Sequence, residues 1–310
     1  MVTRTSSVGP AVRVGPTEVI ERATEAELLA AALGSGAHVL LEGPPGTGKS
    51  TLLRRVASGR QTPFVLVEGN AELTPARLIG HFDPALVLSK GYVPEIFEDG
   101  PLLEALRTGG LLYVEELNRI PEETLNVLLT AMSELEINVP RLGRVAAAPG
   151  FSLVAAMNPF DAVGTARVSG ALYDRTCRIS MGYQSAEAEQ AIVGLRTDEL
   201  DPQWRAKVVD LVRSTRDHAD IRFGSSVRGA IDVARLAVEL AKLRGTPTDD
   251  WHVGLAAARV SLSGRIRLHD GCDRTPEQVI TDLYVDVFGA EPVDPQNHPD
   301  SDTKGSPGEP

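Results

Sequence analysis

One short segment constrains the fold of this chain more than any other: residues 38–50, with the sequence HVLLEGPPGTGKS. The apolar run in its first half predicts a short buried strand, and the Gly- and Pro-rich turn after it ends that strand. Gly43, Gly48, Lys49 and Ser50 match the spacing G-x-x-x-x-G-K-[ST]. In that pattern, backbone N–H groups of the loop surround phosphate oxygens. The segment therefore predicts a strand, a phosphate-binding loop and a helix in succession.

The residue types in this loop fit a nucleoside triphosphate bound together with Mg²⁺. We expect the helix that starts near Lys49 to point its positive end at the same anion. Lys49 is expected to reach the β- and γ-phosphates, and Ser50 to offer its hydroxyl to Mg²⁺. A chance Gly-rich turn is the alternative, but a strand before the loop and an amphipathic helix after it argue against chance. The predicted ATP-binding residues are Gly43, Pro44, Pro45, Gly46, Thr47, Gly48, Lys49, Ser50 and Thr51.

A second strand, in the segment LLYVEE at residues 111–116, ends in two acids. In an open α/β fold its carboxyl end lies at the edge of the sheet where ligands bind. We expect Glu115 to hold Mg²⁺ and Glu116 to orient or polarise the attacking water. Two solvated acids at a strand end are the alternative. Glu115 stands where the usual pattern has Asp, and its longer side chain changes the reach to the metal by about an ångström, which leaves slow hydrolysis open.

Strands and helices alternate along the first part of the chain, which predicts a parallel sheet covered by helices on both faces. The expected strands are residues 38–43, 63–69, 111–116, 152–158 and 177–183. After residue 183 the pattern is helical. We expect a flexible arm at 1–15, a P-loop α/β domain at 16–183 and a smaller all-α lid domain at 184–289. A disordered, acidic and Pro-rich tail is expected at 290–310.

Composition excludes several classes of protein. The net charge of −11 disfavours a duplex-DNA binder with a broad basic face. The two cysteines, Cys177 and Cys272, show no metal-ligand spacing, and Cys177 is expected in the core of a strand. No apolar run reaches the ~18 residues that a membrane helix needs, and the first residues lack the apolar core of a secretion signal. We therefore expect a cytoplasmic protein without a membrane span.

With both motifs placed, the chain resembles AAA+ ATPases of the MoxR group, which includes NorQ, CbbQ and GvpN-like proteins. The resemblance covers about residues 17–285. It is carried by GPPGTGKS, by FEDGPLLEALRTGGLLYVEELNRIPEETLNVLLTAMSE, and by AAMNP, ALYDR and GSSVRGAIDVARLAVELAKLRG. The sequence ELNR at 116–119 is more specific to this group than the phosphate loop.

The resemblance also assigns residues outside the two motifs. It implies that Asn158 is sensor 1, a carboxamide that contacts the γ-phosphate and the lytic water. It implies that Arg175 is an arginine finger acting on the nucleotide of a neighbouring subunit, although Arg178 lies close enough to be confused with it. Arg228 matches sensor 2 in the helical domain. A polar strand end at Asn158 and solvated surface arginines are the alternatives for these positions.

As a function, the resemblance implies a homo-oligomeric ring, expected to be a hexamer, that remodels, activates or assembles a client. A protein with a von Willebrand factor A-type domain is the implied partner. The alternatives are a nucleic-acid-linked motor such as a helicase or restriction subunit, a small-molecule phosphotransferase, and a slow nucleotide-gated scaffold. An insertion at residues 81–97 has one lysine and two acids, which argues against nucleic acid. A second insertion at 136–151 predicts a hairpin, and Tyr92, Val93 and Phe97 are candidate client contacts.

Overall fold

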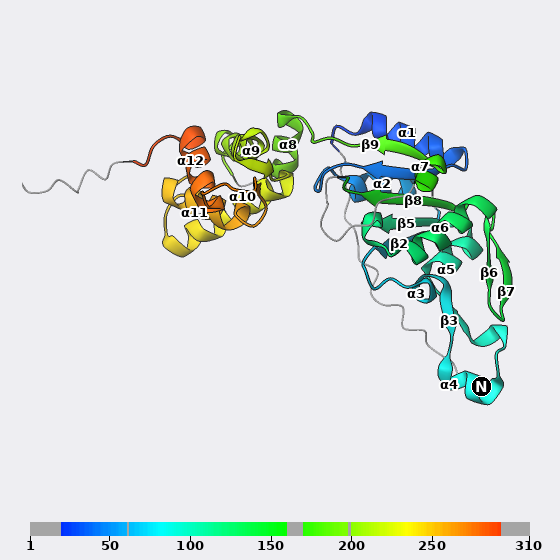
Figure 1. Ribbon diagram of the computed structural model, residues 1–310. Coiled ribbons are helices and arrows are strands. Elements are labelled where there is room, and N and C mark those ends of the chain that lie inside the picture. Colours follow the sequence, from blue (N-terminus) through cyan, green and yellow to red (C-terminus); the bar gives the residue numbers. More distant parts are fainter. Residues whose placement is uncertain (1–19, 61, 160–169, 198–199, 293–310) are drawn as a thin grey trace, which may run out of the picture. The chain divides into compact units, whose positions relative to one another are not determined.

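The structure is a computed structural model that describes residues 20–60, 62–159, 170–197 and 200–292. The expected arm at 1–15 and most of the expected tail, from 293 onward, lie outside the described residues. By its internal contacts the chain divides into two compact units, Met1–Ala188 and Glu189–Pro310. Figure 1 shows the helices and strands of both units. The domain limits drawn from the sequence stay a prediction.

The first unit contains a five-stranded parallel sheet. Its strands lie in the order β2-β5-β8-β1-β9. They are β1 (His38–Glu42), β2 (Phe64–Glu68), β5 (Leu111–Glu115), β8 (Ser152–Met157) and β9 (Thr176–Ser180). The three inner strands are buried along almost their whole length, as expected for a parallel sheet with both faces covered. The five expected strands and the α/β fold class are thus confirmed.

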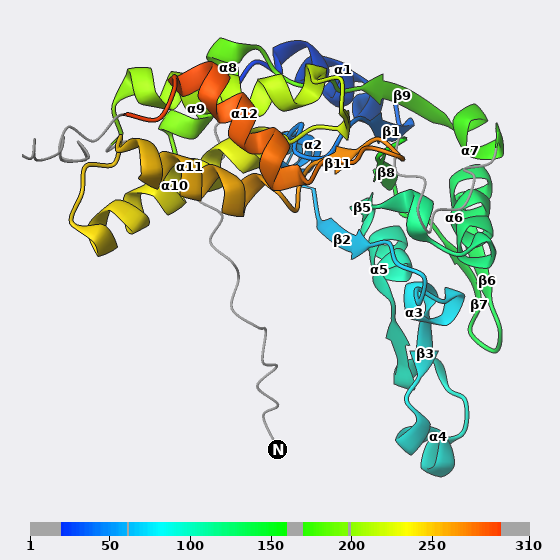
Figure 2. The same ribbon diagram turned by 60° about the vertical axis from the view of Figure 1, so that its left-hand side comes forward.

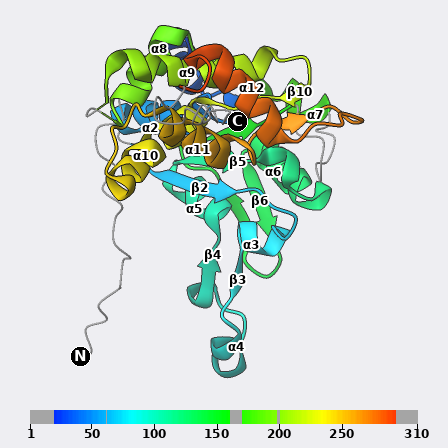
Figure 3. The same ribbon diagram turned by 90° about the vertical axis from the view of Figure 1, so that its left-hand side faces the viewer.

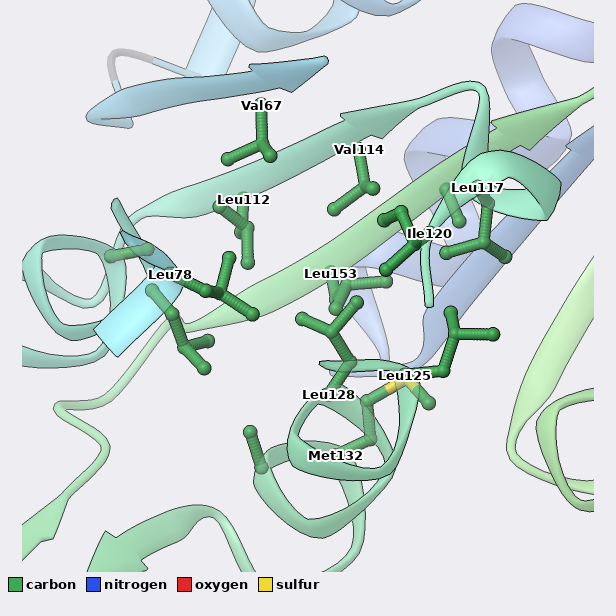
Figure 4. Packing of buried hydrophobic residues seen from close by; sticks show 14 of the residues in the cluster. Val67, Leu78, Leu112, Val114, Leu117, Ile120, Leu125, Leu128, Met132 and Leu153 are labelled. Atoms are coloured by element: carbon green, nitrogen blue, oxygen red, sulfur yellow. The ribbon is translucent and has the colours of Figure 1, made fainter. Parts of the chain in front are cut away.

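Alternating strand residues face opposite layers of helices. Leu111 and Tyr113 of β5 belong to the core under α1 (Ala23–Gly34) and α2 (Lys49–Arg60). Leu112 and Val114 belong to the core under α3 (Pro75–Ile79), α5 (Pro101–Thr108) and α6 (Glu122–Glu134). Figure 4 shows this second core, with Val67, Leu112, Val114 and Leu153 of the sheet facing Leu125, Leu128 and Met132 of α6. The period of two in the strands and of 3.6 in the helices therefore produces two cores around one sheet.

Leu135 and Cys177 are among the exposed apolar residues of the first unit. Leu135 ends α6 in the left-handed conformation with φ 51° and is 50% exposed. Cys177, expected in the core, is exposed because β9 is an edge strand that pairs only with β1. A residue on an edge strand can face solvent while a residue of the same apolar type on an inner strand cannot.

Both insertions fold as separate small elements. The first forms β3 (Gly80–Phe82), α4 (Pro84–Lys90), the 3₁₀ turn η1 (Pro94–Ile96) and β4 (Phe97–Asp99). Figures 2 and 3 show β3, β4 and α4 extending away from the five-stranded sheet. The second is the predicted hairpin of β6 (Glu136–Val139) and β7 (Gly143–Ala146). The Arg141 guanidinium at its tip lies 3.6 Å from the centre of the Tyr92 ring, so the two insertions touch.

The second unit consists of helices around one core of its own. They are α8 (Ala186–Gly194), most of which lies in this unit, α9 (Pro202–Asp217), α10 (Val227–Arg244), α11 (Trp251–Leu262) and α12 (Pro276–Phe288). Two short antiparallel strands, β10 (Ile221–Phe223) and β11 (Arg267–Leu268), join them, and the sequence pattern does not indicate these strands. Within the described ranges, no helix has the length and apolar character needed to cross a membrane.

Candidate nucleotide-binding site

The phosphate loop and the acidic end of β5 lie next to each other at the carboxyl edge of the sheet. β8 pairs with β1 on one side and with β5 on the other, all parallel. The phosphate loop follows β1, Glu115 ends β5 and Asn158 follows β8, so the ends of three adjacent strands meet. This is the edge at which open α/β sheets bind ligands.

The loop after β1 has a backbone that two of its glycines make possible. A Cβ atom on Gly43 would lie 2.1 Å from the carbonyl oxygen of Met181, which leaves room for no side chain. Gly48 has φ 85°, a left-handed conformation that glycine adopts without strain. Thr47 is buried, and its hydroxyl donates to the carbonyl oxygen of Pro44 at 3.0 Å. The hydrogen bond within the loop and the close approach to Met181 both stabilise this backbone.

The Lys49 side chain folds back over this loop. Its Nζ donates to the carbonyl oxygens of Gly43 and Pro44 at 2.8 and 2.9 Å. Lys49 is also the first residue of α2, so its charge lies at the positive end of that helix. An anion bound at the loop would therefore be near the Lys49 ammonium, the amino end of α2 and the backbone N–H groups of the loop.

Ser50 and Glu115 form the centre of the second motif. The Ser50 hydroxyl donates a short hydrogen bond to Glu115 Oε1, and its oxygen lies 3.1 Å from the Tyr113 hydroxyl. Burial, as the largest cause, raises the pKa of Tyr113, which keeps this phenol neutral. A hydroxyl and a carboxylate side by side are oxygen ligands of the kind that Mg²⁺ takes. The pair fits a magnesium site, and the longer side chain of Glu115 does reach Ser50.

Glu116 has a strained backbone next to this pair. It lies in the left-handed region with φ 49° and ψ 44°, which costs a non-glycine residue about 1–2 kcal/mol. Gly69 lies so close that a Cβ there would be 2.5 Å from the Glu116 carbonyl oxygen. The Glu116 carboxylate is 46% exposed and pairs with Arg119 Nε at 3.0 Å. Strain of this kind at a ligand edge is typical of functional positions.

Asn158 is held in place by a buried residue that sequence reasoning did not assign. Asn118 lies in the 3₁₀ turn η2 (Leu117–Arg119), and its Nδ2 donates to the Asn158 carbonyl oxygen at 3.4 Å. Asn118 is 7% exposed. The sequence signal for Asn118 was its place in the segment ELNR, directly after the acidic end of a strand. A buried amide at such a place needs a hydrogen-bond partner.

The structure separates Arg175 from the phosphate loop of its own unit. Arg175 follows α7 (Gly170–Asp174) and directly precedes β9, so it lies at the amino edge of the sheet. Its Nε donates to the Ser133 hydroxyl at 2.5 Å and its Nη1 to the Ala171 carbonyl oxygen at 2.9 Å. Arg178 differs: its Nε pairs with Glu42 at 2.8 Å, just before the phosphate loop. The two arginines thus face different surroundings.

Arg228, the remaining predicted site residue, belongs to the second unit. It is exposed in the first turn of α10, where the helix macrodipole disfavours a cation. Among the residues that the structure describes, Arg228 has no hydrogen bond or ion pair that would offset this cost. A neighbouring anion would stabilise it.

Known proteins resemble the chain in the region that builds this site. Residues 38–176 match the family described as AAA domain (dynein-related subfamily). The gas vesicle ATPase GvpN of Haloferax mediterranei is 29% identical over 74% of this chain and 70% of that protein. Gas vesicle ATPase GvpN1 of Halobacterium salinarum is 28% identical over 82% and 76%. Both similarities extend into the second unit, since 74% and 82% of the 310 residues are more than the first unit, Met1–Ala188, contains.

A solved structure shares the fold. The RuvB Holliday junction branch migration motor of Thermotoga maritima aligns with a TM-score of 0.51 at 20% identity, over 76% of this chain and 67% of that one. The family match and the site geometry identify residues 38–176 as an ATP-hydrolysing AAA domain, in a chain that is similar to the gas vesicle ATPases GvpN.

Proposed function

We propose that the chain works as a ring of identical subunits, expected to be a hexamer, in which ATP hydrolysis remodels, activates or assembles a client protein. The position of Arg175 is the observation that supports a ring. It lies at the amino edge of the sheet, whereas the phosphate loop lies at the carboxyl edge. Because these two edges lie apart within one subunit, the position of Arg175 supports a finger that acts on the nucleotide of a neighbouring subunit.

Within one subunit, the proposed ATP site consists of the phosphate loop with Lys49 and the Ser50–Glu115 pair. Lys49 would exchange the carbonyl oxygens of Gly43 and Pro44 for phosphate oxygens, which are stronger partners because they are charged. Ser50 and Glu115 would hold Mg²⁺, whose charge offsets that of the phosphates.

Glu116 and Asn158 are the proposed partners of the attacking water. The water needs an acceptor for its proton and a group that holds its orientation. The exposed carboxylate of Glu116 supplies the first, once its pairing with Arg119 is exchanged for the water. The amide of Asn158, at the end of the neighbouring strand β8, supplies the second.

Two arginines complete the proposed mechanism. The Arg175 guanidinium of the adjacent subunit would stabilise negative charge that develops on the transferred phosphoryl group. Arg228, exposed in the first turn of α10, is the proposed sensor of the bound phosphates in the helical unit. A nucleotide shared by such elements couples bond cleavage to movement of domains.

The gas vesicle ATPases suggest what is done with this energy. Their name connects them with gas vesicles, and this likeness is the ground on which we propose an assembly or maturation client here. A von Willebrand factor A-domain protein is the proposed partner. A nucleic-acid motor is the second candidate, and the first insertion speaks against it because Lys90 is outnumbered by Asp83 and Glu95. A slow nucleotide-gated scaffold would need the same site with low turnover.

The test compares two variants that stop the cycle at different points. Glu116→Gln should keep ATP bound, whereas Lys49→Ala should bind ATP about 100-fold more weakly. At an ATP concentration that saturates only the first variant, only that variant should form a ring with Mg·ATP in light scattering. Tagged forms of both are then recovered from the native host. The proposal expects a protein retained by Glu116→Gln in ATP and released in ADP. An identical set of proteins with both variants, or nucleic acid in place of protein, would contradict it.

A further inference from the structure

Arg22 is a buried arginine in the first unit that neither sequence motif includes. It directly precedes α1, and its side chain is 6% exposed. Its Nη1 pairs with Glu25 at 2.6 Å. A buried guanidinium is costly unless its N–H groups find acceptors. Two acceptors of Arg22 are backbone carbonyl groups far away in sequence, so the side chain connects separate segments of the first unit.

One terminal nitrogen of Arg22 holds two separate backbone carbonyls. Nη2 donates to the Thr47 carbonyl oxygen at 3.2 Å and to the Gly182 carbonyl oxygen at 2.5 Å. Thr47 lies in the phosphate loop, and Gly182 follows β9. Nε of Arg22 is buried without a partner among the described residues, a cost that goes with reaching both carbonyls.

The contact with Thr47 acts on the phosphate side of the loop through one peptide bond. The Thr47 carbonyl and the Gly48 N–H belong to the same planar trans peptide, so they point in opposite directions. Fixing the carbonyl therefore fixes the direction of that N–H. A charged donor on the carbonyl also polarises the peptide, which strengthens its N–H as a donor to an anion.

The contact with Gly182 belongs to a clasp between two segments of the first unit. The Gln184 side chain donates to the Ile20 carbonyl oxygen at 3.3 Å, and the Ser185 N–H donates to Glu21 Oε2 at 2.7 Å. Glu21 lies in the left-handed region with φ 55°, so the clasp holds a strained backbone. Residues 182–185 precede α8, and the second unit begins within that helix at Glu189.

We infer that Arg22 is a positioning residue that couples the phosphate loop to the segment leading into the second unit. When phosphate binds, the Thr47–Gly48 peptide is drawn toward it, and Arg22 passes this constraint to Gly182. Coupling of two sites is reciprocal, so the clasp in turn affects the affinity for ATP. The inference rests on ATP binding to the phosphate loop, as proposed above.

The experiment measures both ends of this coupling in the full chain. Amide hydrogen exchange of residues 181–188 is followed with and without the slowly hydrolysed analogue ATPγS, and ATP affinity is titrated. In the wild type, nucleotide should slow exchange at Ser185. Arg22→Gln should weaken ATP binding by about tenfold and abolish this slowing, because coupling of this kind is typically 5- to 150-fold. Arg55→Gln, the same change on the exposed face of α2, should leave both unchanged.

Two further results decide the case. Arg22→Lys keeps a charge but lacks the forked donors, so its affinity should fall between those of the wild type and Arg22→Gln; this variant also serves if Arg22→Gln does not fold. Full retention of affinity or of nucleotide-dependent protection in either variant would overturn the coupling. A wild-type protein that binds no nucleotide would instead refute the proposed function, so the two failures are distinguishable.

Discussion

The Ser50 hydroxyl donates a hydrogen bond to the Glu115 carboxylate, across 65 residues of sequence. The two residues meet because β8 lies between β1 and β5, so the loop after one strand and the end of the other share an edge. The Tyr113 hydroxyl also contacts this pair, at 3.1 Å from the Ser50 hydroxyl oxygen. The two oxygen groups that we propose as Mg²⁺ ligands thus lie side by side within one subunit.

Replacing Glu115 by Ala should separate metal-dependent from metal-independent binding. If Glu115 and Ser50 hold Mg²⁺, the variant should lose most of the gain in ATP affinity that Mg²⁺ provides, while affinity measured in excess chelator stays near that of the wild type. Calorimetric titrations with Mg²⁺ and with chelator give both values. An undiminished effect of Mg²⁺ would remove Glu115 from the metal site.

Replacing Glu116 by Gln should stop hydrolysis without preventing binding. The amide cannot accept a proton, so turnover should fall by about 10²- to 10⁴-fold, the usual contribution of a general base. Phosphate release and fluorescent-nucleotide binding on the same sample separate the two effects. Arg119→Ala is the matched control, since it removes the partner of Glu116 but leaves its carboxylate. Turnover like that of the wild type in Glu116→Gln would reject its role.

The finger can be tested by mixing two inactive variants. Arg175→Ala subunits should bind ATP but hydrolyse it about 10³-fold more slowly, as is found when an arginine finger is lost. Lys49→Ala subunits lack ATP but keep Arg175. Mixed rings should recover activity, because an intact finger then faces an occupied site. Absence of recovery at every mixing ratio would argue against catalysis across an interface.

Arg178 provides the comparison for that experiment. Its pairing with Glu42 occurs within one subunit, and the Tyr173 hydroxyl donates to the same carboxylate at 2.7 Å. The effect of Arg178→Ala should therefore stay within the subunit that carries it. ATP hydrolysis should not recover when this variant is mixed with Lys49→Ala. Recovery with Arg178→Ala but not with Arg175→Ala would exchange the roles of the two residues.

His38 should make the first unit sensitive to acid. The Leu153 N–H donates to its Nδ1 at 3.0 Å, so the remaining nitrogen, 3.3 Å from the Met132 carbonyl oxygen, carries the proton. Burial lowers the pKa of His38 from 6.5, and the hydrogen bond to Met132 opposes this in part. The unfolded chain thus takes up a proton first, so stability is intact above pH 6.5 and falls as the pH drops below it.

Urea unfolding at a series of pH values measures this effect. His38→Gln, whose amide can donate and accept but does not titrate, should lose less stability than the wild type between about pH 7 and pH 5. His81→Gln, the same change at an exposed histidine, is the matched control. Parallel curves for His38→Gln and the wild type would show that His38 does not cause the acid sensitivity.

The sequence predicts most of the fold because local patterns decide it. Apolar runs between turns mark the five strands, and the spacing of Gly43, Gly48 and Lys49 admits few alternatives. Strand order is a different matter: nothing local states that β8 lies between β1 and β5, so the meeting of Ser50 and Glu115 follows from topology alone.

Other features escape sequence reasoning because they depend on long-range contacts. Arg22 looks like an ordinary charged residue before a helix, and only the fold brings Thr47 and Gly182 to it. Cys177 reads as a core residue until β9 proves to be an edge strand. Residues whose partners lie far away in sequence cannot be assigned from their own neighbourhood.

The most direct test of the account is equilibrium binding of Mg·ATP to the wild type and to Lys49→Ala. The ammonium of Lys49 lies within the phosphate loop, and a hydrogen bond to a charged group contributes ~1.5–3 kcal/mol. We predict that the variant binds ATP about 100-fold more weakly than the wild type while unfolding at the same urea concentration. Equal affinity of the two proteins would contradict the claim that this loop holds the triphosphate.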